Sequence, residues 1–240
     1  MKKARKRLFH KDDSPVAPPL NIDALLKNVH SLELNYQGFQ PSEKKALLRT
    51  ISALCKEVIE NAMCHGLDGC IKLEDLNLLF RFYVDLEKEF KLDFNKDIKK
   101  MILEGLAKFE NDFVLNSNEK VINVALKRLC AIWARFYSRV YPDCMICLIQ
   151  IPADIEQLLL ICFRDAIVLP YYKNFMNADE GISMSFSKYI QNEEENGVKQ
   201  QHKLILIQCF GVLSSIKGKD MNQRLIEDLL SGVRRSIEVL

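Results

Sequence analysis

The cysteines are the residues of this chain best suited to chemistry. There are eight of them in 240 residues, and Cys144 and Cys147 are spaced as C-x-x-C. A redox pair of that form needs an exposed thiol with a lowered pKa, usually at a helix N-terminus. Here the neighbours Met145, Ile146 and Leu148 are apolar, and no second pair follows at zinc-finger spacing. We therefore interpret the two cysteines as packing residues, because free cysteine behaves as a small hydrophobe in such surroundings.

A second candidate is a metal site around a tight turn. Cys64, His65 and Cys70 flank the turn, but a structural zinc ion needs four ligands. The nearest candidates for the fourth position, Asp68 and Glu74, are atypical ligands in such a set. The sequence therefore predicts neither a metal nor a cofactor.

No catalytic constellation can be assembled from the remaining polar residues. His10, His30 and His202 are isolated and belong to no Ser/His/Asp or H-E-x-x-H pattern. The only Gly-Lys pair, Gly218-Lys219, lacks every other part of a phosphate-binding loop. The carboxylates are spread as they are on solvated helix faces. The sequence therefore predicts a protein that is not an enzyme.

The composition is that of a folded protein with balanced charge. Apolar residues make up 48% and charged residues 28%, and the net charge is +2 from 34 basic and 32 acidic residues. That balance argues against a nucleic-acid or membrane surface, and no apolar run approaches the roughly 18 residues of a membrane span. No signal peptide or N-x-S/T sequon is visible, so we expect a cytoplasmic protein with free thiols rather than disulfides.

The first 20 residues differ from the rest of the chain. They combine a basic run with three prolines and little apolar surface, so we predict a disordered tail over residues 1–20. Short Lys/Arg clusters are typical of nuclear-import signals. A solubilising tail or a contact with an anionic surface is the alternative. The basic residues are Lys2, Lys3, Arg5, Lys6 and Arg7.

From residue 21 onward the apolar spacing is helical. Leu47, Ile51, Leu54 and Val58 recur every three or four residues on one helix face, and Gly66 is expected to end that helix. The same reasoning gives helices over about 21–34, 41–66, 71–90, 95–112, 116–142, 153–169 and 204–213, followed by a last helix through 225–237.

Three segments carry more specific expectations. Pro142 is expected to end or kink the long helix that precedes it. Residues 171–200, with two glycines and an acidic run, are expected to form a long loop with one helical turn near 184–190. Residues 204–213 are apolar enough for a buried strand, although helix is favoured. The fold class is therefore all-α: an irregular bundle of about eight to ten helices forming a single domain over 21–240, with no internal repeat.

The central part of the chain carries a recognisable pattern. Trp133, Phe136 and Tyr137 precede Pro142, and an apolar stretch and a second proline follow. This order resembles the HbrB-like family, the proteins observed with Rictor. The pattern continues with Pro152 and closes with Phe163-Arg164-Asp165-Ala166-Ile167.

The resemblance implies a non-catalytic helical adaptor, an accessory subunit of the Rictor-containing target-of-rapamycin kinase complex that works through protein partners. Arg164 is the candidate partner-binding residue, because a charged group in an apolar helix must either pair within the fold or meet a partner. The alternative from another class is a nuclear protein whose basic N-terminal tail contacts nucleic acid or an import receptor.

Overall fold

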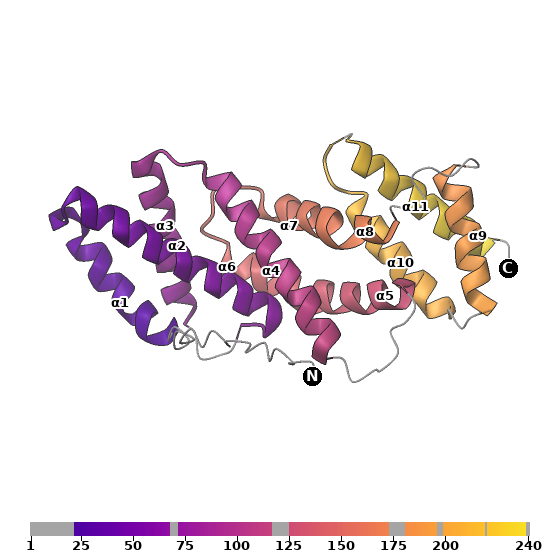
Figure 1. The fold of residues 1–240 in the computed structure, drawn as a ribbon, viewed down its shortest axis with the longest axis horizontal. Helices are drawn as coiled ribbons and strands as arrows, with labels where there is room; N and C mark the ends of the chain where they lie inside the picture. Colours follow the sequence, from indigo (N-terminus) through magenta and orange to yellow (C-terminus); the bar gives the residue numbers. More distant parts are fainter. Residues whose placement is uncertain are drawn as a thin grey trace, which may run out of the picture.

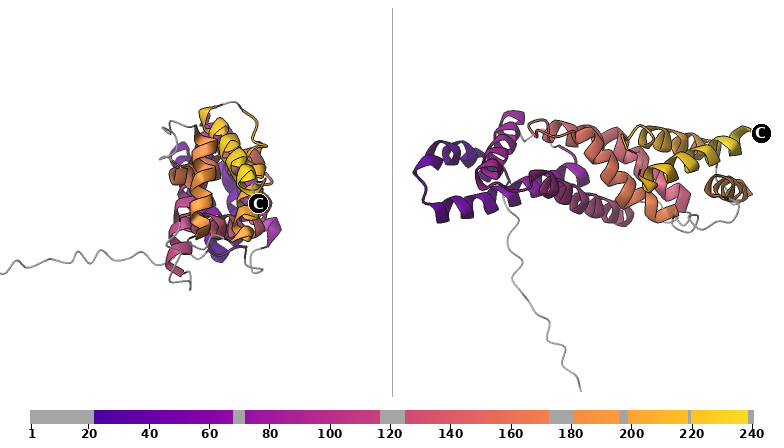
Figure 2. Two further views of the ribbon diagram at one scale, coloured as in Figure 1. Left: turned by 90° about the vertical axis from the view of Figure 1, so that its right-hand side faces the viewer. Right: turned by 90° about the horizontal axis from the view of Figure 1, so that it is seen from above.

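The computed structural model describes residues 22–67, 72–116, 125–172, 181–195, 199–218 and 220–238. Helices and turns account for these ranges, and no strand occurs within them. The predicted all-α fold is confirmed. The molecule is elongated (Figure 1), with α1–α3 at one end, α4–α8 in the middle and α9–α11 at the other end, and the view from above agrees (Figure 2).

The first end of the molecule and the adjoining part of its middle are built from long helices whose ends follow the expected signals. Gln40 directly precedes α2, and its backbone N–H donates to Glu43 Oε2 in the first turn of the helix at 2.7 Å. This hydrogen bond is half of a capping box. The helix closes with Gly66 at a φ of 87°, a left-handed conformation that suits glycine. This confirms the predicted stop. The helices are α1 (Ile22–Asn35), α2 (Pro41–Cys64), α3 (Leu73–Phe90) and α4 (Phe94–Asn116), with a 3₁₀ turn at Tyr36–Gly38.

The middle of the molecule contains two helical paths, each interrupted by a five-residue π-turn. The remaining helices form the other end, where α11 packs against both α9 and α10. The first path is α5 (Ala125–Arg135), π-turn Phe136–Val140 and α6 (Tyr141–Cys147); the second is α7 (Ile155–Phe163), π-turn Arg164–Val168 and α8 (Leu169–Tyr172); α9 (Ile182–Glu195), α10 (Gln200–Leu213) and α11 (Met221–Glu238) follow.

Pro142 is expected either to end or to kink the helix. The first expectation is wrong: Pro142 does not end the helix, because the helical path continues through Pro142 as α6. The preceding π-turn explains how. The Tyr141 N–H bonds to the Phe136 carbonyl, five residues back, and the wider turn accommodates a proline ring that would clash with the carbonyl four residues back in a regular helix. Pro170 follows the second π-turn in the same way, after a Leu169 N–H bond to the Arg164 carbonyl.

The predicted loop over 171–200 is also wrong for most of its length. Residues 182–195 form the 14-residue helix α9, which packs on α11. Phe186 and Ile190 are fully buried one turn apart, so tertiary packing supplies the driving force that the polar composition hides. The approach of the two helices is close at Gly232, where an added Cβ would lie 2.7 Å from the Ser183 carbonyl oxygen.

The favoured helix over 204–213 is confirmed, and it starts earlier, at Gln200. Its neighbours explain why a strand does not form: α10 packs against both α5 and α11, and Leu206, Phe210 and Leu213 are buried at helical spacing. The predicted tail over 1–20, with Lys2, Lys3, Arg5, Lys6 and Arg7, lies outside the described residues, as do 173–180 and 196–198 of the predicted loop.

Candidate partner-binding site

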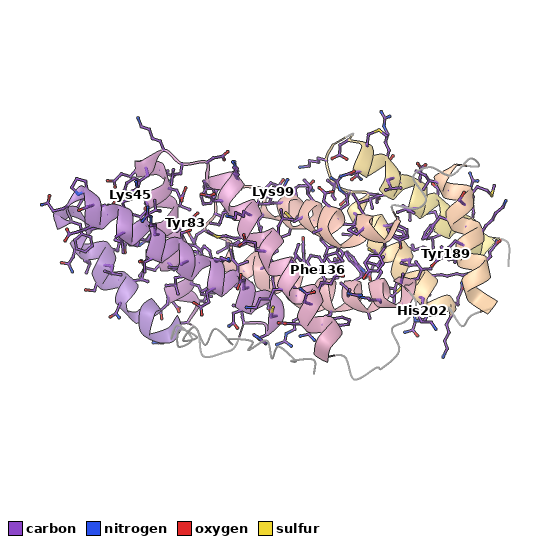
Figure 3. The ribbon with its side chains drawn as sticks, viewed as in Figure 1. Lys45, Tyr83, Lys99, Phe136, Tyr189 and His202 are labelled. Atoms are coloured by element: carbon purple, nitrogen blue, oxygen red, sulfur yellow. The ribbon has the colours of Figure 1, made fainter. Side chains whose placement is uncertain are left out.

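An aromatic cluster occupies the centre of the molecule, where Phe136 is labelled in Figure 3. Its members come from α5, the first π-turn, α6 and α7. Phe136 and Phe163 stack with ring centroids 4.0 Å apart, and Trp133 meets Phe163 edge-on at 5.4 Å. Such contacts add about 0.5–1.5 kcal/mol each to the burial of the rings. The aromatic cluster comprises Trp133, Phe136, Tyr137, Tyr141 and Phe163.

Trp133 connects this cluster to α10. Its ring is fully buried, and its Nε1–H donates to Gln208 Oε1 on α10 at 3.1 Å. The polar edge of the indole is therefore satisfied while the ring is removed from water. The tryptophan of the sequence pattern is a packing residue at the junction of α5, α7 and α10.

Arg164, the candidate partner-binding residue, begins the second π-turn and is only 2% exposed. Its guanidinium makes a two-pronged contact with Asp220, with N–O distances of 3.2 and 3.0 Å. Nε donates to Asp165 Oδ1 at 2.7 Å, and one terminal nitrogen also donates to Gln223 Oε1 at 3.1 Å. This is the internal pairing that the sequence allowed, and a partner contact by Arg164 itself stays a prediction.

Two of the partners of Arg164, Asp220 and Gln223, are themselves fixed at the start of α11. Asp220 Oδ1 accepts the Gln223 backbone N–H at 2.6 Å, as an N-cap residue does. Burial alone would raise the pKa of Asp220, but the Gln223 N–H and the Arg164 guanidinium outweigh it and lower that pKa. Gln223 also donates to the Leu213 carbonyl at the end of α10. The network therefore ties the second π-turn to α10 and α11.

A groove of about 490 Å³ opens beside the aromatic cluster, between the end of α6 and the start of α7. Ile149 is 67% exposed and Ile146 is 42% exposed. Large aliphatic side chains in a concave surface favour contact with another molecule. The apolar lining is Met145, Ile146, Leu148, Ile149, Ile151, Ala153 and Ile155.

The rim of this groove is acidic. Asp154 and Glu156 are the charged residues that line it, and both are exposed. Asp154 also caps α7 by accepting the Gln157 N–H at 3.2 Å, which fixes its position. Burial and the nearby Glu156 carboxylate raise the pKa of Tyr141 to about 12, so the tyrosine remains neutral there. The groove thus offers aliphatic contacts with negative charge at one edge.

The predicted packing role of the cysteines fits their surroundings. Seven of them are described, and all seven are buried free thiols. Burial, with the nearby Asp143, raises the pKa of Cys147 to about 12, and burial also raises the pKa of Cys144 well above its ordinary value. A raised pKa keeps a thiol protonated and unreactive. Cys70 lies outside the described residues.

Those metal and histidine candidates that lie within the described residues are not brought together. Cys64 is buried at the end of α2, and His65 follows it in an exposed position. Within the described ranges, no three His, Cys, Asp or Glu side chains are grouped as a metal would require. His202 accepts the Lys199 N–H at 3.1 Å at the start of α10, and burial, with Lys127 and Lys199, lowers its pKa.

Two features of the site were missed from the sequence although signals for them existed. Asp220 precedes Gln223 by three residues at the start of the last helix, a recognisable capping pattern. Ile149 follows Ile146 by three residues just before Pro152, and an exposed apolar pair before a turn favours a surface site. No signal in the sequence connects Arg164 with Asp220, because 56 residues separate them.

These observations define a class of protein: a helical module whose described surface offers an apolar groove and whose buried Arg164 pairs within the fold. Among the described helices, none combines the length and hydropathy needed to cross a bilayer. The family model described as HbrB-like matches residues 52–152 and 148–176. The chain belongs to the HbrB-like family, and the groove lies where the two matched segments overlap.

The chain is similar to two proteins of Saccharomyces cerevisiae. It is 38% identical to "Target of rapamycin complex 2 subunit BIT61" over 94% of this chain and 48% of that protein. It is 39% identical to "Probable target of rapamycin complex 2 subunit BIT2" over 89% of this chain and 45% of that protein. The chain therefore spans about half the length of the curated relatives that it matches. No solved structure matches it.

Proposed function

We propose that this protein is a non-catalytic accessory subunit of a target-of-rapamycin complex that contains Rictor. One observation carries the proposal: the similarity to BIT61, whose name makes it a subunit of target of rapamycin complex 2, extends over 94% of this chain. The family resemblance of residues 133–167 and the all-helical fold support it. The partner is accordingly a protein assembly, and the working location is wherever that assembly resides.

The groove between α6 and α7 is the surface through which we propose that the subunit docks. Its aliphatic floor suits the apolar side chains of a partner segment, and the carboxylates of Asp154 and Glu156 suit a lysine or arginine beside them. Complementary charge at a rim sets orientation and specificity, whereas the buried apolar anchors supply most of the affinity. The occupant is thus an amphipathic segment with a basic flank.

Affinity purification from the native cells, followed by quantitative mass spectrometry, tests both parts. The wild-type protein should recover the kinase, the Rictor-type subunit and their companions. Ile149→Glu should reduce that recovery at least about tenfold, because a charge in a buried apolar contact costs more than about 1.4 kcal/mol.

Leu204→Glu is the matched control. Leu204 is a comparable aliphatic residue, 57% exposed on α10, and it lies outside the groove. Both variants should retain the thermal midpoint of the wild type. Equal loss of partners in both variants would refute the groove, and failure of the wild-type protein to recover any Rictor-containing complex would refute the assignment itself.

The role of the basic tail stays a separate prediction. Deleting residues 1–20 should leave the far-UV circular dichroism of the helices unchanged, because those residues are too polar to contribute to the core. Loss of a nuclear signal in the truncated protein would support import through Lys2, Lys3, Arg5, Lys6 and Arg7. An unchanged distribution would leave the solubilising role as the better explanation.

A further inference from the structure

A second cavity, of about 390 Å³, lies at the opposite end of the molecule from α9–α11, between α2 and α4 and beside the end of α3. It is within the size range of small-ligand sites. Its lining mixes aliphatic side chains with charges, and the aliphatic part is contributed by Leu48, Ala53, Leu92 and Met101.

Glu87 lines this cavity from the last turns of α3 and is only 2% exposed. Its Oε2 atom is buried without a hydrogen-bond partner. A buried carboxylate oxygen without a partner costs free energy, and such groups are rare unless they serve a purpose. Burial raises the pKa of Glu87, the Tyr83 hydroxyl close to its carboxylate lowers it, and the nearby Asp97 raises it, so the pKa is raised on balance.

The charges around the cavity are unevenly distributed. At the rim, Lys56 pairs with Glu104 at 2.7 Å, and Lys100 approaches the same carboxylate at 3.9 Å. Arg49 also lines the cavity and is exposed. Within the described part of the chain, neither Glu87 nor Asp97 forms an ion pair with a cation. The cavity therefore has aliphatic walls, two carboxylates without cationic partners and basic groups at its rim.

We propose that this cavity binds the side chain of a lysine or arginine from a protein partner. The aliphatic stem lies along Leu48, Leu92 and Met101, and the cationic head reaches Glu87, forming a charge-assisted hydrogen bond with a carboxylate that has no cationic partner. A side chain of this kind brings a single charge. A free polyamine carries several, and its further ammonium groups would meet the rim cations Lys56 and Lys100.

The cation chemistry of the site stands on the cavity alone, while the source of the cation in a protein partner rests on the function proposed above. Two measurements keep these apart. The first uses n-butylguanidinium, which reproduces an arginine stem and head, and follows the ¹³C-labelled side-chain carboxyl signals of glutamate in the full chain by NMR. The second repeats the affinity purification with variants of the cavity.

In the first measurement, n-butylguanidinium should bind saturably in the millimolar range and shift the Glu87 carboxyl signal. Glu87→Gln should weaken binding about tenfold or more, since one charge-assisted hydrogen bond is lost. n-Butanol has the same stem without the charge. Its affinity for the wild type should therefore not exceed the affinity of n-butylguanidinium for Glu87→Gln. Glu74→Gln is the control, because Glu74 is exposed in the first turn of the same helix.

In the second measurement, Glu87→Gln and Asp97→Asn should each reduce the recovered complex, and Glu74→Gln should not. Absence of saturable n-butylguanidinium binding, or equal binding to Glu87→Gln, would overturn the site and leave an internal water as its occupant. Tighter binding of spermidine than of n-butylguanidinium, with recovery of the complex unchanged in Glu87→Gln, would overturn the protein source in favour of a small polyamine. If the wild-type protein itself recovered no Rictor-containing complex, the function proposed above would be refuted. The conclusion from n-butylguanidinium binding would not be affected.

Discussion

The two π-turns of the molecule have the same backbone design and different side-chain support. Each is five residues long, each ends on a backbone hydrogen bond to the carbonyl five residues back, and each is followed by one residue and then a proline. The first turn, Phe136–Val140, is held by stacked rings. The second, Arg164–Val168, is held by a buried guanidinium whose partners are Asp165 in the turn itself and Asp220 and Gln223 at the start of α11.

The difference shows that a wide helical turn can be stabilised either by apolar burial or by charge. Ring burial removes surface from water and requires no exact angular fit. The guanidinium requires each of its donors to be satisfied, because an unpaired charge in the interior is costly. The first turn should therefore tolerate changes in pH and salt, and the second should respond to both.

The largest expected effect falls on the first turn. Trp133→Ala should lower the free energy of unfolding by about 3–5 kcal/mol, because a fully buried indole is replaced by a cavity. Urea denaturation followed by circular dichroism measures it. Tyr137→Ala, which removes the more exposed ring stacked on Trp133 at 5.0 Å, should cost less than about half as much. Equal losses would show that stacking, and not burial, holds this turn.

The next effect falls on the second turn. Arg164→Met keeps most of the side-chain volume and removes the charge, so it should cost about 1.5–3 kcal/mol, the range for hydrogen bonds to charged groups. The loss stays below that of Trp133→Ala because Asp220, at 57% exposed, can return to water. Adding salt should reduce the difference in the free energy of unfolding between the wild type and this variant. Co-purification by this variant at normal levels would further show that Arg164 serves the fold and not the partner.

A smaller effect is expected from the prolines themselves. Pro142→Ala and Pro170→Ala should each change the free energy of unfolding by less than about 1 kcal/mol. Removing the proline gives the unfolded chain more freedom, which destabilises the fold, whereas the new backbone N–H can donate within the helix, which stabilises it. Thermal unfolding of the two variants provides the test. A gain of more than about 2 kcal/mol in either would mean that the proline strains its turn, and that the side chains described above compensate for it.

The smallest effect is a dependence on pH that belongs to the second turn alone. The pKa of Asp220 is lower in the folded protein than its ordinary value. Its carboxylate therefore stabilises the fold above about pH 4, and this contribution is lost as the pH falls through the folded pKa. Since the group is largely exposed, the contribution is under about 1 kcal/mol. The advantage of the wild type over Asp220→Asn, which keeps the capping oxygen, should shrink between about pH 5 and pH 2. A difference in stability between the two proteins that stays constant over this pH range would contradict the role given to the Asp220 carboxylate.

Much of the fold could be predicted because helical spacing is a local property. The period of Leu47, Ile51 and Leu54 and the stop at Gly66 required no knowledge of distant residues. Helix α9 was missed for the opposite reason: Phe186 and Ile190 are buried by α11, and the polar residues between them obscure the period. The π-turns were missed because a proline in a helical pattern normally signals an end, and only the structure shows the wider turn that accommodates it.

The candidate sites were less predictable than the fold. Arg164 could be singled out as a charge in an apolar segment, and its internal pairing was one of the two alternatives. Glu87 could have been singled out in the same way, since it continues the buried stripe of Leu76, Phe80 and Tyr83 at helical spacing. For the groove, the sequence offered only the pair Ile146 and Ile149, because the groove itself forms where the end of α6 and the start of α7 face each other across a bend.

The first π-turn also has a consequence for the phase of the helix that follows it. One extra residue in a turn advances everything beyond it by about 100° around the helix axis, compared with an uninterrupted helix. The direction in which α6 presents Ile146 is therefore set at Phe136–Val140, about two to three turns earlier. A change that restored an ordinary turn there would rotate Ile146 out of the groove without altering any residue that lines it.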